Sequence, residues 1–256
     1  MTVERLTGAP ARLEWRVATV VRVREETRRT RTLVLDVPRW PGHLAGQHVD
    51  VRLVAEDGYQ AQRSYSIASP PESPTLELTV ERLEDGEVSS YLCDVLQPGD
   101  GLELRGPIGG YFVWEVALGG PLLLVAGGSG IVPLMAMLRH HAAAEEAVRS
   151  RIPVRLLYSV RGADEIIYAQ ELADLAATRS VRVEYTLTRV VPQDWAGYRR
   201  RIDRALLEEV AWPAAEGARA YVCGPTALVE QVATQLVELG YDPERVRTER
   251  FGPTGS

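Results

Sequence analysis

Three glycines interrupt an apolar run and give it the chemistry of an anion site. Positions 121–138 read PLLLVAGGSGIVPLMAML, with no charged side chain and with Gly127, Gly128 and Gly130 at the centre. Glycines let a backbone approach a pyrophosphate closely, and the first N–H groups of a following helix point at the anion. Pro133 suits the first turn of such a helix. The stretch predicts a strand, a phosphate-binding turn and a helix, although an ordinary buried strand–turn–helix fits it about as well.

A second group combines an anion-binding side chain with an aromatic ring and hydroxyls, and it reads Arg63-Ser64-Tyr65-Ser66. A guanidinium can hold a phosphate through two hydrogen bonds, and a Tyr ring can cover a flat aromatic ligand. A Ser hydroxyl can exchange a hydrogen bond with a ring nitrogen. About twenty residues later, Gly86-Glu87-Val88-Ser89 opens a predicted helix and offers a second anion site. Taken alone, the first group also fits a common strand with exposed Ser and Arg side chains.

The first half of the chain must supply short strands that position these side chains. Apolar and polar residues alternate in several stretches separated by turn residues, which is typical of half-buried antiparallel strands. We expect strands at 16–24, 30–37, 46–53, 63–68, 76–83 and 101–105, and a helix from Ser89 or Ser90 to about Val95. Many short strands joined by turns indicate an antiparallel β-barrel, which we assign to residues 1–118.

In the second half, after Gly119, apolar strands alternate with helices. This alternation predicts an α/β doubly wound parallel sheet over residues 119–256. The expected strands are 122–126, 154–160, 181–187 and 218–223, and the expected helices are 133–147, 171–177, 203–209 and 226–239. Ligands of such sheets bind at the carboxyl ends of the strands. Those ends carry Gly, hydroxyl, Arg and Cys residues, at 127–130, 158–161, 188–189 and 223–225.

Composition limits the class of protein. The 256 residues allow two domains, and 45% hydrophobic with 25% charged residues is typical of a soluble globular chain. The first twenty residues hold charged side chains and no apolar signal segment, so we expect a cytoplasmic protein without a membrane span. The distant Cys93 and Cys223 predict neither a disulfide framework nor a zinc site. The histidines show no ligand spacing, so we expect structural roles for them and no bound metal: His43, His48, His140 and His141.

Charge argues against a nucleic-acid partner, because the net charge is −6 and every basic residue is Arg. The distribution is uneven. Residues 1–39 hold nine Arg against five acids, a local net charge of +4. Solvated faces of edge strands would explain this excess. The sharper interpretation is a docking patch for an acidic protein partner.

In their order along the chain, these motifs resemble the ferredoxin–NADP reductase superfamily. The resemblance extends from about Arg16 to Gly252. It is carried by R-S-Y-S at 63–66, G-E-V-S at 86–89, G-P-I-G at 106–109, G-G-S-G-I-V-P at 127–133, C-G-P-T at 223–226 and the acidic, aromatic tail at 248–252. Many relatives also carry an iron–sulfur domain with C-x₄-C-x₂-C ligands. Two distant cysteines cannot form such a cluster here.

The resemblance implies a flavin-binding barrel, and the form G-E-V-S favours FAD over FMN. By position, Arg63 would hold the flavin phosphate, Tyr65 would stack on the isoalloxazine, and Ser66 would lie near its N5 atom. The same correspondence places Val88 and Ser89 at the pyrophosphate. The further flavin- and nucleotide-binding residues it implies are Ser64, Val80, Arg82, Gly86, Gly128, Gly130, Thr188, Cys223, Gly224, Pro225 and Phe251.

For the second domain, the resemblance implies a pyridine nucleotide. Arg161 and Arg189 could grip a 2′-phosphate together, which favours NADPH over NADH, although both would also fit as solvated loop residues. The resemblance places Ser66 and Cys223 at the hydride transfer. It gives Glu249 a role in protonation or electron exit.

The predicted function is therefore a flavin-dependent NAD(P)H oxidoreductase. Hydride passes from nicotinamide to bound FAD, and electrons pass to a separate acceptor such as a ferredoxin or an oxygenase component. We expect a monomer that binds neither nucleic acid nor membrane. Two alternatives stay open: a free-flavin reductase, and a non-catalytic redox or nucleotide sensor.

Overall fold

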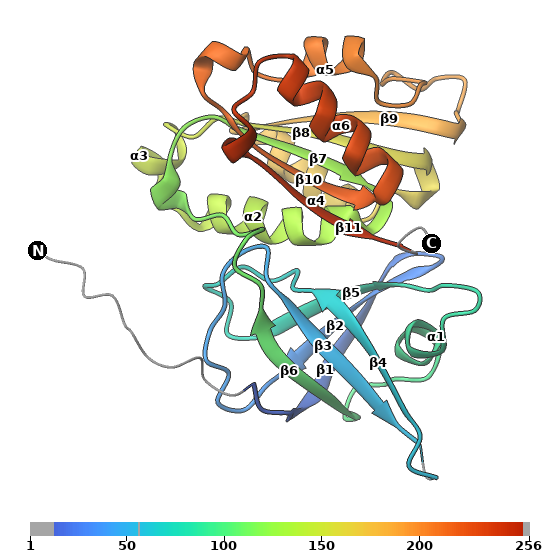
Figure 1. Cartoon of the computed structure of the whole chain (residues 1–256). Coiled ribbons are helices and arrows are strands. Elements are labelled where there is room, and N and C mark those ends of the chain that lie inside the picture. Colours follow the sequence, from blue (N-terminus) through green and yellow to red (C-terminus); the bar gives the residue numbers. More distant parts are fainter. Residues whose placement is uncertain (1–12, 56, 253–256) are drawn as a thin grey trace, which may run out of the picture.

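The computed structural model describes residues 13–55 and 57–252, which form two lobes stacked on one another (Figure 1). One lobe contains an antiparallel sheet and the other a parallel sheet, as predicted from the two halves of the sequence. The assigned boundary at residue 118 coincides with the end of the short helix η1 (Val116–Leu118), and stays a prediction. Arg5 and Arg12 of the predicted basic segment lie outside the described residues.

The first lobe is a six-stranded barrel with the strand order β4-β3-β6-β1-β2-β5. The two edge strands of this order, β4 and β5, also meet. Just after β4, Ile67 bridges to Leu78 of β5, and the Ala68 N–H donates to the Glu77 carbonyl at 2.8 Å. This contact closes the sheet on itself. The strands are β1 (Arg16–Thr27), β2 (Thr30–Asp36), β3 (His48–Val54), β4 (Gln60–Ser66), β5 (Leu76–Glu81) and β6 (Gly101–Ile108).

Alternation along the strands sends one set of apolar side chains into the barrel. Leu76, Leu78 and Val80 of β5 are buried there, and the residues between them face the other way. Helix α1 (Glu87–Asp94) adds Val88 and Leu92 to the same core. It begins two residues earlier than the Ser89 start that the sequence predicts, so residues 87 and 88 belong to its first turn.

The second lobe is a five-stranded parallel sheet with the order β11-β10-β7-β8-β9. Four of its strands are those predicted: β7 (Leu122–Gly127), β8 (Val154–Gly162), β9 (Val181–Val190) and β10 (Arg219–Pro225). The fifth strand, β11 (Val246–Phe251), lies where the sequence predicts only a tail. It pairs with β10 along its whole length and brings Glu249 opposite Cys223.

Helices cover both faces of this sheet, which is the doubly wound arrangement (Figure 1). Along β7, Leu122 and Leu124 pack with the helices on the barrel side, and Leu123 and Val125 pack with those on the outer side. The barrel-side helices are α2 (Ile131–Ala143) and α4 (Ala169–Ala177), and the outer ones are α5 (Arg204–Val210) and α6 (Thr226–Glu238). The predicted helix 133–147 is divided into α2 and the short α3 (Glu146–Arg149). The remaining short helices are η2 (Gly128–Gly130), η3 (Ala163–Glu165), η4 (Ala214–Glu216) and η5 (Pro243–Arg245).

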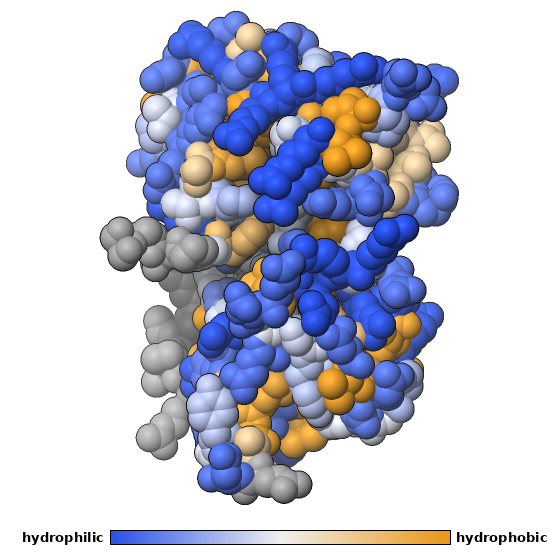
Figure 2. Space-filling view, turned by 90° about the vertical axis from the view of Figure 1, so that its right-hand side faces the viewer, coloured by the Kyte–Doolittle hydropathy of each residue, from blue (hydrophilic) through white to orange (hydrophobic). Residues whose placement is uncertain are grey.

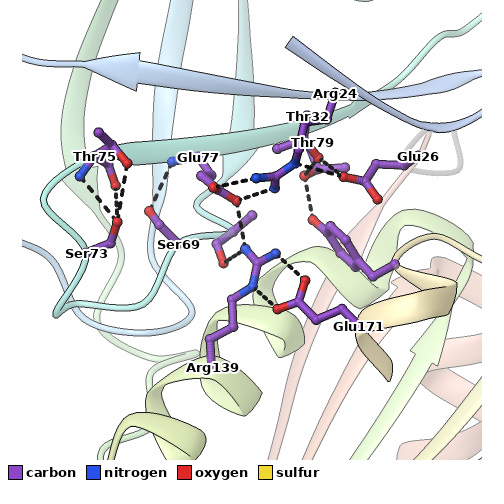
Figure 3. A network of polar contacts seen from close by, with 12 residues as sticks. Arg24, Glu26, Thr32, Ser69, Ser73, Thr75, Glu77, Thr79, Arg139 and Glu171 are labelled. Carbon is purple, nitrogen blue, oxygen red and sulfur yellow. Dashed lines mark hydrogen bonds and ion pairs between the residues drawn. The ribbon is translucent and has the colours of Figure 1, made fainter. Parts of the chain in front are cut away.

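An apolar contact and a polar network hold the two lobes together. Phe112, in the segment that leaves the barrel, packs edge-on against Tyr221 of β10 with ring centroids 5.4 Å apart. Glu77 of β5 accepts from Arg24 of β1 at 2.8 Å and from Arg139 of α2 at 2.9 Å, as Figure 3 shows. Arg139 also pairs with Glu171 of α4 at 2.6 Å. These contacts fix how the carboxyl ends of the parallel strands face the barrel.

Candidate active site

A cavity of about 890 Å³ lies between the two lobes. Strand β4 and the start of α1 line it from the barrel, and the carboxyl ends of the parallel strands line it from the other side. Figure 2 shows this hollow at mid-height, rimmed by hydrophilic side chains with hydrophobic surface inside. The structure brings thirteen predicted site residues together on its wall: Arg63, Ser64, Tyr65, Ser66, Gly86, Val88, Ser89, Gly128, Arg161, Thr188, Arg189, Pro225 and Phe251.

The last four residues of β4 present an anion-binding group, an aromatic ring and two hydroxyls to this cavity. Pairing with β3 fixes their register, with Ser64 opposite Asp50 and Ser66 opposite His48. The Ser64 hydroxyl donates to Asp50 at 2.6 Å, which orients this part of the strand. Burial raises the pKa of Tyr65, so its hydroxyl stays protonated at neutral pH. This strip can therefore face a flat aromatic ligand and hold an anion beside it.

The start of α1 forms a compact turn against β5. The buried Ser89 hydroxyl accepts from the Leu83 N–H and donates to the Gly86 carbonyl, both at 3.1 Å. A Cβ atom at Gly86 would lie 2.2 Å from Ser89 Oγ, so this position requires glycine. No side chain caps the helix, which leaves its first N–H groups available to an anionic ligand.

The glycine turn after β7 packs backbone to backbone against the end of β10. A Cβ atom at Gly130 would lie 2.2 Å from the Cys223 carbonyl oxygen. One at Gly224 would lie 3.1 Å from the Gly127 Cα. Neither Gly130 nor Gly224 lines the cavity, so both act by permitting the close approach of the two strand ends. Gly128 adopts a φ of +54° and does line the cavity, at the start of η2, which leads directly into the uncapped α2.

Four other predicted residues lie off the cavity wall. Val80 is buried in the barrel core, and Arg82 pairs with Asp94 at 2.6 Å. Cys223 and Glu249 lie side by side on β10 and β11 as register partners. Contact of any of these four with a ligand stays a prediction.

Cys223 and Glu249 share an unusual electrostatic setting. Burial raises the pKa of the Cys223 thiol well above its ordinary value, and the neighbouring Glu249 raises it further, so the group is a neutral thiol. Burial also raises the pKa of the Glu249 carboxyl to about 7. Its Oε2 atom is buried without a hydrogen-bond partner among the described residues. Oε1 lies 4.0 Å from Nδ1 of His48 on the barrel.

Sequence reasoning missed several residues of the cavity wall, including Arg201 and Glu165. Arg201 ends a run of three arginines whose other members are engaged outside the cavity. Arg199 donates to the Trp195 carbonyl at 2.9 Å, and Arg200 pairs with Glu209 at 2.7 Å. The sequence shows the run of three arginines, but it does not show which of the three side chains points into the cavity.

Within residues 13–55 and 57–252, no cluster of His, Cys, Asp and Glu could hold a metal ion. Both cysteines are buried and free. Among the helices of this described part, none is sufficiently long and apolar to cross a membrane.

The donor set of the cavity fits a flavin dinucleotide together with a second nucleotide. Arg63 and the bare start of α1 offer two anion contacts beside the Tyr65 ring. The opposite wall offers the backbone of the glycine turn at Gly127 and Gly128 and a separate set of arginines. This is the class of two-domain fold that binds a flavin on a barrel and a nucleotide on a parallel sheet.

Comparison with known proteins agrees with this class. The family model of the oxidoreductase FAD-binding domain matches residues 17–113, and that of the oxidoreductase NAD-binding domain matches residues 124–234. The crystal structure of an Amycolatopsis cytochrome P450 reductase has a TM-score of 0.78 and 30% identity, and the match covers 95% of this chain and 71% of that one. The FAD/NAD-binding domain of the nitric oxide dioxygenase from Vibrio cholerae has a TM-score of 0.80 and 26% identity. That match covers 93% of this chain and 99% of the Vibrio domain.

The glycine betaine monooxygenase reductase subunit of Pseudomonas aeruginosa is 31% identical over 243 residues, covering 91% of this chain. The chain spans 63% of the length of that relative. The present chain belongs to the ferredoxin–NADP reductase superfamily, with an FAD-binding domain followed by an NAD-binding domain. The predicted family and cofactors are thereby confirmed.

Proposed function

We propose that the protein is a FAD-dependent NAD(P)H oxidoreductase that passes electrons from a nicotinamide nucleotide to a separate acceptor protein. The observation that carries the proposal is the shared cavity. Tyr65 and Ser66 of the barrel line the same wall as Gly128 and Pro225 of the parallel sheet. A flavin held by one lobe and a nicotinamide held by the other can therefore meet.

On the barrel, Arg63 binds the flavin phosphate and Tyr65 covers the isoalloxazine. The first N–H groups of α1, at Val88 and Ser89, bind the pyrophosphate. When bound, FAD supplies the capacity to accept a hydride and to release electrons singly. The protein supplies alignment and electrostatics.

On the parallel sheet, the turn at Gly128 binds the nucleotide pyrophosphate. Arg161 near the end of β8, Arg189 near the end of β9, and Arg201 all line this cavity, so three guanidiniums are available to a ligand there. Such a group suits a 2′-phosphate, and NADPH is the favoured donor. Glu165 on the same wall could instead accept from a ribose 2′-hydroxyl, as in proteins that use NADH.

At the reacting rings, this chain contributes positioning and charge. Ser66 offers its hydroxyl to the flavin edge, and the neutral thiol of Cys223 excludes water next to it. Glu249 places a carboxyl that titrates near neutral pH beside them. Hydride loss leaves a positive charge on the nicotinamide, and an ionised carboxylate stabilises that charge.

The acceptor is a separate electron-transfer or oxygenase protein. Two relatives support this choice by name, one a reductase subunit of a monooxygenase and the other a cytochrome P450 reductase. The predicted basic docking patch retains support from exposed arginines of the β1–β2 hairpin, such as Arg22 and Arg28. Arg24 is unsuited to docking, because it is paired with Glu77.

Stopped-flow reduction of the FAD-loaded protein by NADPH and by NADH tests the proposal. We expect the protein to retain FAD through gel filtration and to bleach it when either nucleotide is added, faster with NADPH. Loss of flavin on the column would instead indicate that flavin is a substrate. Protein that binds no FAD and oxidises neither nucleotide with an artificial acceptor would contradict the assignment, and bound FAD without reduction would indicate a sensor.

A further inference from the structure

His48 lies between the two halves of the proposed reaction site, although its sequence context predicts only a structural role. It begins β3, where its register partner in the antiparallel ladder is Ser66. Its Nδ1 atom faces Oε1 of Glu249 at 4.0 Å. Glu249 is in turn the register partner of Cys223. One barrel side chain therefore meets the carboxyl group of the other lobe, next to both residues predicted to border hydride transfer.

The two groups lie close enough for one to influence the ionisation of the other. Glu249 Oε2 is buried without a partner among the described residues, so the imidazole of His48 is the polar group that the carboxyl faces. Burial raises the pKa of Glu249 to about 7 and lowers the pKa of His48. The pair has the same net charge whether both groups are neutral or both are ionised. Burial accounts for the pKa of Glu249, and burial with Asp50 accounts for that of His48, so the 4.0 Å separation is what links the two groups.

Neighbouring ionisable groups are neutral or engaged elsewhere. Asp50, two residues further along β3, pairs with Arg105 at 2.9 Å and opposes the effect of burial on the pKa of His48. Cys223 on β10 is a neutral thiol. Arg247 on β11 donates to the Tyr111 carbonyl. His48 is therefore the ionisable side chain that the structure places within 4.0 Å of the Glu249 carboxyl, whose pKa is otherwise set by burial.

We propose that His48 is a positioning residue for hydride transfer, which holds the Glu249 carboxyl across the boundary between the lobes and favours its ionised form. The inference rests on the proposed function. Because burial lowers the pKa of His48, its imidazole acts near neutral pH through its N–H group, and an N–H donor favours a carboxylate over a neutral carboxyl. More of the protein then carries the negative charge that stabilises the nicotinamide as hydride leaves it.

The pairing can be tested without turnover, by following imidazole NMR signals of the FAD-loaded protein against pH. Glu249→Gln removes a favourable negative charge, so the midpoint of the His48 titration is expected to fall by about one pH unit. Glu72→Gln is the matched control, because Glu72 pairs with His140 at 2.6 Å elsewhere along the same boundary. It should leave the His48 titration unchanged. A His48 midpoint that is equal in wild type and Glu249→Gln overturns the pairing.

The functional part is tested by the rate of flavin reduction as a function of pH. His48→Phe retains a ring and removes both nitrogens, so Glu249 should ionise at higher pH. We expect the pH profile of the reduction rate to shift toward higher pH by about one unit. The variant should then reduce flavin about tenfold more slowly than wild type near pH 6 and at an equal rate near pH 9. His48→Asn places an amide nitrogen close to the Nδ1 position and should recover most of that loss.

A double variant separates positioning from a purely structural role. If His48 acts through Glu249, His48→Phe should change nothing further in a Glu249→Gln background. An equal, pH-independent loss in both backgrounds overturns the proposal. Failure of the wild-type protein to reduce FAD would contradict the proposed oxidoreductase function instead, and the NMR titration would still decide the pairing.

Discussion

At the scale of single residues, the arginines on the cavity wall decide which nucleotide is used. Arg161→Ala and Arg189→Ala each remove a charged donor that suits a 2′-phosphate, and hydrogen bonds to charged groups contribute about 1.5–3 kcal/mol. We therefore expect each change to raise the KM for NADPH by roughly ten- to a hundredfold and to affect NADH little. Steady-state kinetics with both nucleotides provides the measurement.

The matched control for the arginine variants is Arg204→Ala. Arg204 lies on α5, pairs with Glu208 at 3.0 Å and does not line the cavity. It should leave both KM values unchanged. Equal losses with NADPH and NADH in the Arg161 and Arg189 variants would show that these guanidiniums bind a part common to both nucleotides.

Glu249 makes a second residue-level prediction, because its pKa also governs stability. In the folded protein the pKa of this carboxyl is about 7, whereas the ordinary pKa of a Glu carboxyl is 4.5. Between those values the folded state binds more protons than the unfolded state, so rising pH favours unfolding. Glu249→Gln should abolish this contribution and raise the free energy of unfolding at about pH 8 by up to ~3 kcal/mol relative to wild type.

Urea unfolding at saturating FAD, at about pH 5 and pH 8, measures the effect. The two proteins should differ most at the higher pH. Glu208→Gln, an exposed carboxyl on α5, is the control and should change stability by less than about 0.5 kcal/mol at either pH. A Glu249→Gln protein that is less stable than wild type at high pH would show that the carboxylate makes a favourable contact.

The residues that the sequence revealed are those in contiguous motifs. The sequence predicts Arg63, Tyr65 and Ser66 as site residues because their side-chain chemistry suits a flavin and their four-residue motif, in order with the others, resembles that of the superfamily. His48 was assigned a structural role, since its partner Glu249 lies about two hundred positions away in the sequence and the two meet only when the lobes dock. Local patterns carry no information on such a meeting.

At the scale of elements, the missed strand has a physical reason. β11 lies at the edge of the sheet and reads VRTERF, with polar or charged side chains at four of six positions. Interior strands of a parallel sheet are buried on both faces and show continuous apolar runs. An edge strand has no such requirement, so β7 was predicted from its composition and β11 was not.

The contact between the ends of β7 and β10 makes an element-level prediction. At Gly130, a Cβ atom would lie 2.2 Å from the Cys223 carbonyl oxygen, so Gly130→Ala must push the two strand ends apart. We expect a loss of about 2–3 kcal/mol in unfolding free energy, typical of overpacking a tight site. We also expect weaker nucleotide binding, because the phosphate turn moves. Thermal unfolding and nucleotide titration provide the two readouts.

Gly110→Ala serves as the control for the glycine variant. A Cβ atom there meets no atom within 4 Å, and its φ lies outside the left-handed region. Alanine should therefore be neutral or slightly stabilising at this position. A Gly130→Ala protein as stable as Gly110→Ala would show that the turn relaxes at no cost and that backbone contact is not what requires glycine.

At the scale of the whole molecule, catalysis depends on how firmly one lobe is held against the other. Arg139 of α2 joins Glu77 of the barrel to Glu171 of α4 (Figure 3). Arg139→Met keeps an apolar stem but leaves Glu77 with Arg24 as its remaining guanidinium partner. Removing one partner of a buried ion pair lowers the free energy of unfolding by about 3–5 kcal/mol when the remaining charge is uncompensated. Arg24 compensates Glu77 in part, so we expect about 1–3 kcal/mol here.

The kinetic consequence distinguishes a loss of docking from a loss of the flavin site. FAD affinity should be unchanged, because the predicted flavin contacts of Arg63, Tyr65, Val88 and Ser89 all lie on the barrel lobe. The rate of flavin reduction should fall at least about tenfold, since small misplacements of a reacting group are costly. Arg182→Met, which breaks the exposed Arg182–Glu184 pair on β9, should change neither quantity. If Arg139→Met lowers stability but leaves the reduction rate at the wild-type value, the apolar contact around Phe112 and Tyr221 suffices to align the two lobes.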